Sequence, residues 1–218
     1  MPRNKFRTVA EAVALISDGA TVGLVGGGSG LQEAGALFAE VERRFLETGH
    51  PAGLTLVHAL GIGDKAERGL NRFAHRGLVS AVIGGHWVWS PRMQALAADN
   101  EIEAYVLPGG VVGQLYREIG AGRPGLFTHV GLGTFVDPRH GGGRMNAAAT
   151  RTLADVLEID GREVMRYRPF PVDIALLRGS YADADGNISF AQECANLDMF
   201  DLALAAHNSG GKVIVQVR

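Results

Sequence analysis

Short apolar runs and longer stretches of helical periodicity alternate along this chain. The first run, residues 20–25, is apolar and β-prone, and it is long enough for one buried strand. Behind it, apolar residues recur at the spacing of one helical face from residue 31 to residue 46. Further apolar runs of strand length follow at residues 54–57, 78–83 and 102–106. The alternation predicts an α/β fold, a mostly parallel open sheet flanked by helices.

The same periodicities predict the other elements. We expect further helices at residues 8–18, 68–73, 91–98, 111–121 and 198–208. We expect further strands at residues 128–135, 174–177 and 212–217. Residues 156–159 and 163–167 predict a hairpin, because Asp160-Gly161 between them is a favoured turn. Residues 183–187 resemble part of a calcium loop, but Tyr181 and Gln192 would occupy its first and twelfth ligand positions, which favours a simple turn.

Glycines gather directly after each of the first four expected strands. The residues are Gly26, Gly27, Gly28 and Gly30, then Gly61 and Gly63, then Gly84 and Gly85, then Gly109 and Gly110. These positions are the carboxyl ends of the strands, where open α/β sheets bind ligands. The loop from Gly26 to Gly30 could cradle a phosphate, a carboxylate or an oxyanion with its amides. The alternative is a tight turn whose glycines only let a helix pack close to a strand.

Three known glycine motifs do not fit this first loop. It has no lysine, so it is not a P-loop. A dinucleotide fingerprint fails because Leu31 or Glu33 falls where its last glycine belongs. A nucleophile elbow around Ser29 fails because Leu31 again replaces a glycine. The loop therefore predicts an anion or acyl site of another kind.

Composition narrows the class of protein. The 218 residues fit one large domain or a domain and a half, and a net charge of −2 gives no basic surface for nucleic acid or an acidic membrane. Cys194 is the single cysteine, so no disulfide can form within the chain, which fits a cytoplasmic protein. We expect Cys194 to be a small buried apolar residue. No apolar run approaches the roughly 20 residues of a membrane span, and the N-terminus does not have the pattern of a signal peptide.

Four stretches carry a resemblance to a known family. They are residues 25–30 (VGGGSG), residues 84–87 (GGHW) with Ser90-Pro91-Arg92, residues 131–138 (GLGTFVDP), and residues 141–146 with three glycines and Asn146. On these stretches the chain resembles the N-terminal, or α, half of family I CoA-transferases, of the propionate/acetate type. The likeness runs from about Val9 to the last residue, and the GTFVDP run is its most specific part.

The resemblance implies a reaction and a division of labour. Family I enzymes move CoA from a short-chain acyl-CoA to a free carboxylate, through a glutamyl-CoA thioester on an active-site glutamate. That glutamate lies in the C-terminal, or β, half of the family. Residues 1–218 therefore correspond to the α domain, with no catalytic residue in this chain and no activity expected of it alone. The implied substrate is a CoA thioester with small carboxylic acids, without a tightly bound cofactor or metal, in a homo- or hetero-oligomer that includes a β half.

Candidate site residues follow from the glycine loops and the resemblance together. For the substrate-binding or oxyanion loop they are Gly26, Gly27, Gly28, Ser29, Gly30, Gly109 and Gly110. For the substrate edge or the surface that faces the partner half they are His86, Trp87, Gly133, Thr134, Phe135, Asp137 and Asn146. The family usually has a glutamine where this chain has Gly109, which puts the usual activity or substrate choice in question.

Other residues and functions stay open at this point. Glu33 fits an acid that favours the start of a helix rather than a nucleophile. His58 and His86 are either structural or part of the site wall. Trp87 and Trp89 either line an acyl pocket or pack against the partner half. The main alternative function is a catalytically inactive ligand-binding or structural module of the same fold. A sugar-phosphate isomerase-like enzyme is a third possibility, although the chain has no convincing acid/base pair for it.

Overall fold

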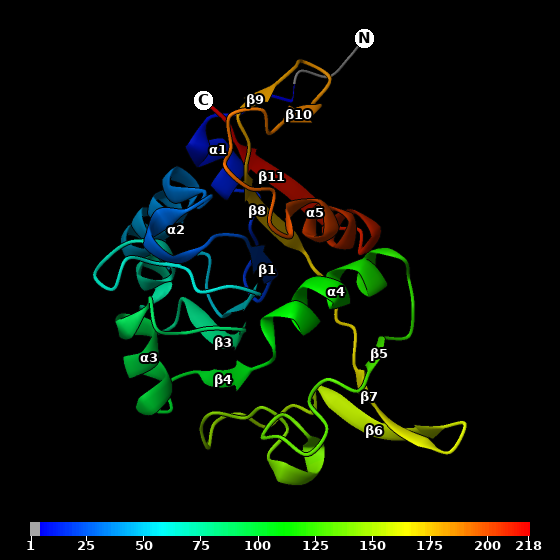
Figure 1. Ribbon diagram of the computed structural model, residues 1–218. Coiled ribbons are helices and arrows are strands. Elements are labelled where there is room, and N and C mark those ends of the chain that lie inside the picture. The colour runs from blue at the N-terminus through cyan, green and yellow to red at the C-terminus, as the bar shows by residue number, and fades with distance from the viewer. Residues whose placement is uncertain (1–4) are drawn as a thin grey trace.

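The computed structural model describes residues 5–218, so residues 1–4 of the predicted domain lie outside the described residues. A parallel sheet of six strands forms its centre (Figure 1). Its strands, in spatial order, are β11 (Lys212–Gln216), β8 (Ile174–Arg178), β1 (Thr21–Leu24), β2 (Leu54–His58), β3 (Val79–Gly84) and β4 (Glu103–Val106). All five pairings are parallel. The predicted α/β class with a mostly parallel open sheet is confirmed.

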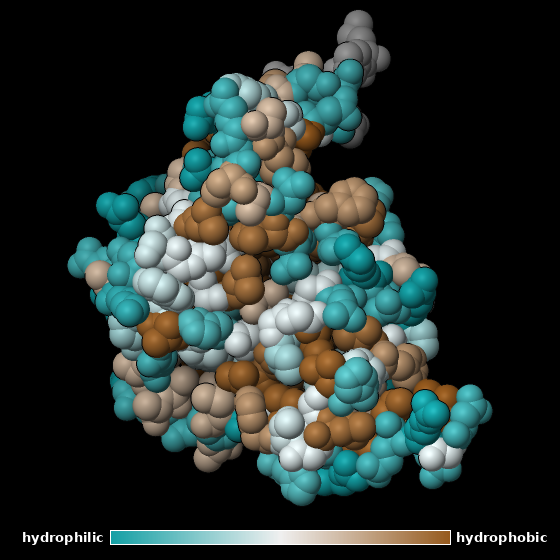
Figure 2. All heavy atoms as spheres, viewed as in Figure 1, coloured by the Kyte–Doolittle hydropathy of each residue, from teal (hydrophilic) through white to brown (hydrophobic). Residues whose placement is uncertain are grey.

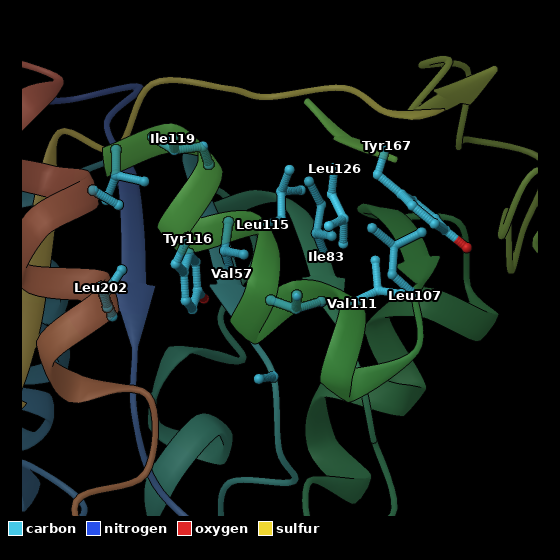
Figure 3. Close-up of a cluster of buried hydrophobic side chains, with 14 of the residues drawn as sticks. Val57, Ile83, Leu107, Val111, Leu115, Tyr116, Ile119, Leu126, Tyr167 and Leu202 are labelled. Atoms are coloured by element: carbon cyan, nitrogen blue, oxygen red, sulfur yellow. The ribbon is translucent and has the colours of Figure 1, made fainter. Parts of the chain in front are cut away.

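Helices cover both faces of this sheet because strand residues alternate between two cores. One core contains Val22, Leu24 and Leu56 of the strands, and helices α1 (Val9–Val13), α2 (Gly35–Thr48) and α3 (Pro91–Ala98) pack on it with the 3-10 turn η2 (Gly69–Phe73). The other core contains residues such as Val57, Ile83 and Leu177, under α4 (Gly109–Gly120) and α5 (Met199–Asn208) (Figure 3).

Close approach of α5 to the sheet depends on one glycine of β1. A Cβ at Gly23 would fall 2.9 Å from Cδ2 of Leu202 and closer still to its Cδ1. Leu202 is fully buried between the helix and the strand. The helix can therefore sit against the centre of the sheet only because residue 23 has no side chain.

A second, antiparallel sheet follows α4 and extends away from the main body (Figure 1). Its strand order is β5 (Leu126–Thr128), β7 (Arg162–Tyr167) and β6 (Ala154–Ile159). The predicted hairpin is confirmed, because Asp160 and Gly161 both adopt positive φ, at 50° and 74°, between β6 and β7. Both residues of a type I′ turn need such φ values.

Residues 183–187 form the predicted turn between two short strands, β9 (Tyr181–Ala182) and β10 (Ile188–Ser189). The Asp183 carboxylate accepts hydrogen bonds from the backbone N–H and the side-chain amide of Asn187, each 2.8 Å long. These local bonds from one side chain hold the two ends of the turn together.

Several predicted boundaries were wrong. The first helix ends at Val13 rather than residue 18. The strand expected at residues 128–135 stops at Thr128, because Gly131 and Gly133 have positive φ and the chain turns there. The short helix expected at residues 68–73 is present as a 3-10 helix over Gly69–Phe73, one residue shorter than predicted. Cys194, expected to be buried, is exposed.

Apolar side chains are not confined to the two cores. Figure 2 shows apolar spheres gathered on the lower half of this face, around the region between α4 and β6 of Figure 1. Between the start of α4 and the end of β6 in the sequence, the exposed large apolar residues are Phe127, Val130, Phe135, Met145, Leu157 and Ile159. Among residues 5–218, no helix is both long and apolar enough to cross a membrane.

Candidate functional site

The loops that follow β1, β2 and β3 meet at the carboxyl edge of the sheet and are joined by backbone hydrogen bonds. Ser29 N–H, at the tip of the first loop, donates to the carbonyl of Gly63 in the second loop over 2.8 Å. Lys65 N–H of the second loop donates to the carbonyl of Trp89 in the third loop over 2.9 Å. These bonds join the three loops into one block at the predicted ligand edge.

The indole of Trp89 fills space that glycines leave open in two of these loops. A Cβ at Gly28 would fall 2.5 Å from Nε1 of Trp89, and one at Gly61 would fall 2.6 Å from its Cδ1. The ammonium of Lys65 lies over the ring, 4.9 Å from the centroid. Gly28 and Gly61 therefore make room for an aromatic side chain, which differs from the close packing of a helix on a strand considered for the first loop.

The first glycine loop also uses some of its own amides internally. Gly27 N–H donates to the carbonyl of Leu31 over 2.8 Å, and Ser29 N–H is bound to Gly63. Gly26 and Gly27 are buried, whereas Ser29 is exposed with a φ of 65°. Positive φ is uncommon for a residue with a side chain, and such positions gather at functional sites. The part of this loop that faces solvent is its tip, at Ser29.

Glu33 does not have the role expected for it. Helix α2 begins at Gly35 rather than at residue 31, because Gln32 has a φ of 58°, and Glu33 lies before the first turn. The Glu33 side chain is buried and its Oε1 accepts a 2.7 Å hydrogen bond from Gly63 N–H. Burial raises the pKa of the Glu33 carboxyl, and the N–H of Gly63 partly offsets that rise.

The start of α4 offers free backbone donors at the same edge. The helix begins at Gly109, two residues earlier than predicted, and its N-cap residue Pro108 provides no side-chain cap. Within residues 5–218, no acceptor receives the N–H of Gly109 or Gly110. The first turns of α3 and α2 differ, because distant side chains bind their N–H groups. The side-chain oxygen of Asn71 accepts the N–H of Arg92 in α3, and that of Gln216 accepts the N–H of Ala36 in α2. The positive end of the α4 dipole is thus available to an anion.

Backbone from two neighbouring loops lies against Gly109. A Cβ at residue 109 would fall 2.7 Å from the carbonyl oxygen of Ala59, and a Cβ at Gly85 would fall 2.9 Å from the Cα of Gly109. A Cβ at Gly110, in contrast, would meet nothing within 4 Å. The first residue of α4 is therefore locked to the loops after β2 and β3, while the second faces open space.

His58 closes β2 at this edge as a buried, neutral imidazole. Its Nδ1 lies 2.7 Å from the carbonyl of Leu60, and its Nε2 has no hydrogen-bond partner among the described residues. Burial lowers the pKa of His58 to about 4. Its Nε2 and the equally unpartnered Nε1 of Trp87 both lie beside Gly84, at 2.6 and 2.9 Å from where a Cβ would be. His86, two residues further along β3's loop, is exposed beside Gly61.

The segment from Gly131 to Asn146 lies along the free edge of β4. Val106 N–H donates to the carbonyl of Gly143, and Met145 N–H donates to the carbonyl of Ala104, over 2.8 and 2.9 Å. Thr134 and Phe135 are exposed in this segment, as is Gly133. The structure therefore brings this segment beside the strand that leads into Gly109.

Asp137 and Asn146 hold this segment together. The buried Asp137 carboxylate accepts bonds from Gly133 N–H and from the backbone and guanidinium of Arg139. The Arg139 guanidinium holds the pKa of the Asp137 carboxyl well below its usual range. The Asn146 amide donates to the carbonyls of Ala97 and Ile102, each at 2.8 Å. All of these contacts are internal to the chain.

The strand order reverses next to the first glycine loop. Strands β1 to β4 follow one another in one direction, whereas β8 lies on the other side of β1. In open α/β sheets, ligands bind outside the carboxyl ends of the strands at such a reversal. Gln32 lies there, buried, with its side-chain amide bound to the carbonyl of Ala195 and its Oε1 without a partner among the described residues.

Sequence reasoning missed Asn71 and Gln216, and did not connect Glu33 with Gly63. Asn71 donates to the carbonyl of Trp89 over 3.2 Å and accepts from the N–H of Arg92. Nothing in local periodicity pairs residues so far apart in the sequence. Residues 5–218 contain no group of three His, Cys, Asp or Glu side chains placed to hold a metal ion.

Comparison with known proteins shows to which family this chain is related. The profile of the coenzyme A transferase family matches residues 6–216. The caffeate CoA-transferase of Acetobacterium woodii is 44% identical over 98% of this chain, and the acetate CoA-transferase YdiF of Escherichia coli K12 is 39% identical over 95%. The chain spans about 40% of the length of these relatives.

Solved structures give the same result. The apoenzyme of the acyl-CoA transferase YdiF from E. coli O157:H7 is 38% identical, with a TM-score of 0.96 over 99% of this chain and 42% of that one. Glutaconate coenzyme A-transferase from Acidaminococcus fermentans, at 18% identity and a TM-score of 0.73, shares the fold. The chain belongs to the coenzyme A transferase family.

Proposed function

We propose that this chain is the α half of a CoA-transferase that moves CoA between a short-chain acyl-CoA and a free carboxylate. The catalytic glutamate would lie in a β half, as part of the same polypeptide or as a second subunit. Residues 1–218 would then form one α domain within a cytoplasmic oligomer, with acetate and propionate as the expected small acids. The names of the relatives, caffeate and acetate CoA-transferase, support the reaction class.

The observation that carries the proposal is the free N-terminus of α4 beside the interlocked glycine loops. Attack of a glutamate carboxylate on a thioester puts negative charge on the thioester oxygen, and collapse expels the CoA thiolate. The thiolate then attacks the acyl-glutamyl anhydride, so that the acyl group leaves as a carboxylate and CoA remains on the glutamate. Each of these two attacks on a carbonyl carbon puts negative charge on the carbonyl oxygen, and this charge needs hydrogen-bond donors in a dry site. The N–H groups of Gly109 and Gly110 could supply donors within this chain.

We assign the remaining candidate residues to the walls of that site. The exposed tip at Ser29 and Gly30, with Gly26, Gly27 and Gly28 behind it, would border the substrate. His86, Trp87 and the segment containing Gly133, Thr134, Phe135, Asp137 and Asn146 would face the substrate edge or the β half. No tightly bound cofactor or metal is needed for this chemistry, since the CoA thioester is itself the substrate.

The test uses the protein as purified from its source, with whatever completes it. After incubation with acetyl-CoA, intact-mass measurement should show a CoA adduct, and mass mapping of proteolytic fragments should place it on the β half and not on residues 1–218. Addition of a second short carboxylate should remove the adduct and yield the new acyl-CoA. This chain alone, as the control, should form no adduct. An assembly that neither forms an adduct nor exchanges CoA with any short carboxylate would contradict the proposal and favour the inactive module.

A further inference from the structure

Glu33 is a buried carboxylate placed between glycines of two loops. Its Oε1 accepts the N–H of Gly63 at 2.7 Å, across 30 residues of sequence. Its Cγ lies 2.7 Å from where a Cβ of Gly26 would be, and its Oε2 lies 2.8 Å from the corresponding position at Gly69. The side chain therefore fits a slot that exists because Gly26 and Gly69 have no side chains.

No cation balances this carboxylate. Of the ion pairs formed by residues 5–218, none involves Glu33, and the nearby charge that affects its pKa is the carboxylate of Asp64. Burial of an ionisable group without a cation opposes folding. Glu33 is thus held by backbone N–H groups at a cost in stability, which a purely structural filler would not require.

Gly63, the residue bound by Glu33, connects the three loops. Gly63 donates its N–H to Glu33, and its carbonyl accepts the N–H of Ser29 at the tip of the first loop. Gly63 also lies so close to the carbonyl of Trp89 that a Cβ there would collide with it. Fixing Gly63 therefore fixes both the Ser29 tip and the backbone that carries the Trp89 indole.

We infer that Glu33 is a positioning residue, whose carboxylate holds Gly63 and thereby sets the place of the glycine-loop tip and of Trp89. The inference rests on the proposed function, because these elements border the site assigned to the CoA thioester. Glu33 acts as a hydrogen-bond acceptor in this role and takes no part in proton transfer or nucleophilic attack. Its effect on the reaction is through the geometry of the loops.

Two variants separate the acceptor from the charge. Glu33→Ala removes the acceptor, whereas Glu33→Gln keeps an acceptor oxygen at a similar position and loses the charge. In the complete enzyme, Glu33→Ala should lower kcat by roughly 10- to 100-fold with KM little changed, as expected for a small misplacement of a site wall. Glu33→Gln should restore most of that loss. Glu47→Ala, a change at an exposed acid of the last turn of α2, is the matched control and should keep full activity.

A readout independent of activity comes from the two tryptophans of the chain, Trp87 and Trp89. In a Trp87→Phe background of the complete enzyme, subtracting the emission of the matched Trp87→Phe/Trp89→Phe protein isolates the emission of Trp89. Glu33→Ala should shift this emission to the red and speed amide exchange at Gly63, while Glu33→Gln stays near the parent. Far-UV circular dichroism checks that each variant is folded. If Glu33→Ala does not fold, the kcat and emission of Glu33→Gln provide the test.

The outcomes are distinct. Native emission, native exchange and full kcat in Glu33→Ala would overturn the inference. So would a Glu33→Gln enzyme as slow as Glu33→Ala but with native emission, since Glu33 would then act through its charge. If the complete enzyme transfers no CoA at all, the proposed function fails, and the emission and exchange of Gly63 still decide whether Glu33 holds the loops.

Discussion

The indole of Trp89 lies against the backbone of Gly28, with Nε1 only 2.5 Å from where a Cβ of residue 28 would be. The two residues belong to loops after different strands, β1 and β3. Contact between them joins the ends of strands that are not neighbours in the sheet, since β2 lies between. The glycine loop is therefore shaped by an aromatic ring 61 residues away as much as by its own sequence.

Gly28→Ala should be destabilising, because its Cβ cannot fit beside an indole that other loops hold in place. We expect a loss of about 1–3 kcal/mol in the free energy of unfolding, typical of overpacking. Gly35→Ala is the control, since a Cβ at Gly35 meets nothing within 4 Å and Gly35 is the first residue of α2. Urea denaturation of both variants measures the difference. Equal stability of the two would show that Trp89 moves freely away from Gly28.

Gly109→Ala and Gly110→Ala should differ although the residues are adjacent. A methyl group at residue 109 meets the carbonyl oxygen of Ala59 at 2.7 Å, and backbone cannot turn aside as a side chain can. We expect Gly109→Ala to lower stability by about 1–3 kcal/mol, whereas Gly110→Ala should be neutral or stabilise by up to about 1 kcal/mol. Thermal unfolding measures both. A Gly109→Ala protein as stable as its neighbour would mean that the loop after β2 yields.

The buried His58 should make the protein sensitive to acid. The pKa of His58 is about 4 in the folded state, below its ordinary value of 6.5, so the unfolded chain binds the proton first. Stability should thus be retained above pH 6.5 and fall as the pH drops from 6.5 toward 4, by up to about 3 kcal/mol from this group. Urea denaturation of the wild type and of His58→Gln over this range isolates the contribution. Parallel curves for the two proteins would refute it.

Asn146 should matter for stability rather than for chemistry. Its side chain donates to the carbonyls of Ala97 and Ile102 and accepts from Ala149 N–H at 3.1 Å. Asn146→Ala leaves these groups without partners, and we expect a loss of about 2–4 kcal/mol. Asn208→Ala, at the exposed end of α5, is a comparison with fewer bonds at stake. Stability close to wild type together with a large loss of activity would instead place Asn146 at the substrate.

The sequence predicted the elements of the central sheet well because each strand is short and largely apolar, and glycines follow the first four of them. It also predicted the helix at 91–98 and the Asp160-Gly161 hairpin, which depend on local rules. It failed where backbone conformation is decided by contacts, as at Gln32, whose positive φ delays α2 to Gly35. It failed also at residues 131–133, where glycines turn a strand-like run into a series of turns.

The meeting of the glycine loops at one edge of the sheet could be predicted from the sequence, whereas the contacts that shape these loops could not. Glycines after successive parallel strands had to meet at one edge, and they do. Their packing against Trp89 and Glu33 depends on pairs 30 or more residues apart, which periodicity does not register. Likewise, the N–H groups of Gly109 and Gly110 are free because Pro108 provides no side-chain cap. The sequence shows that a proline stands there, but not which way the N–H groups of the helix point.

The place of β1 in the sheet has a consequence for folding during synthesis on the ribosome. β1 lies between β2 and β8, and Val22 pairs with Ile174. Until Ile174 has emerged, one edge of this early strand has no partner, and Leu202, which covers Gly23, comes later still. Contacts so distant in sequence are slow to form and expose strand edges in the meantime. We expect the nascent chain to stay open at its centre, and to need protection there, until nearly all of this domain has been synthesised.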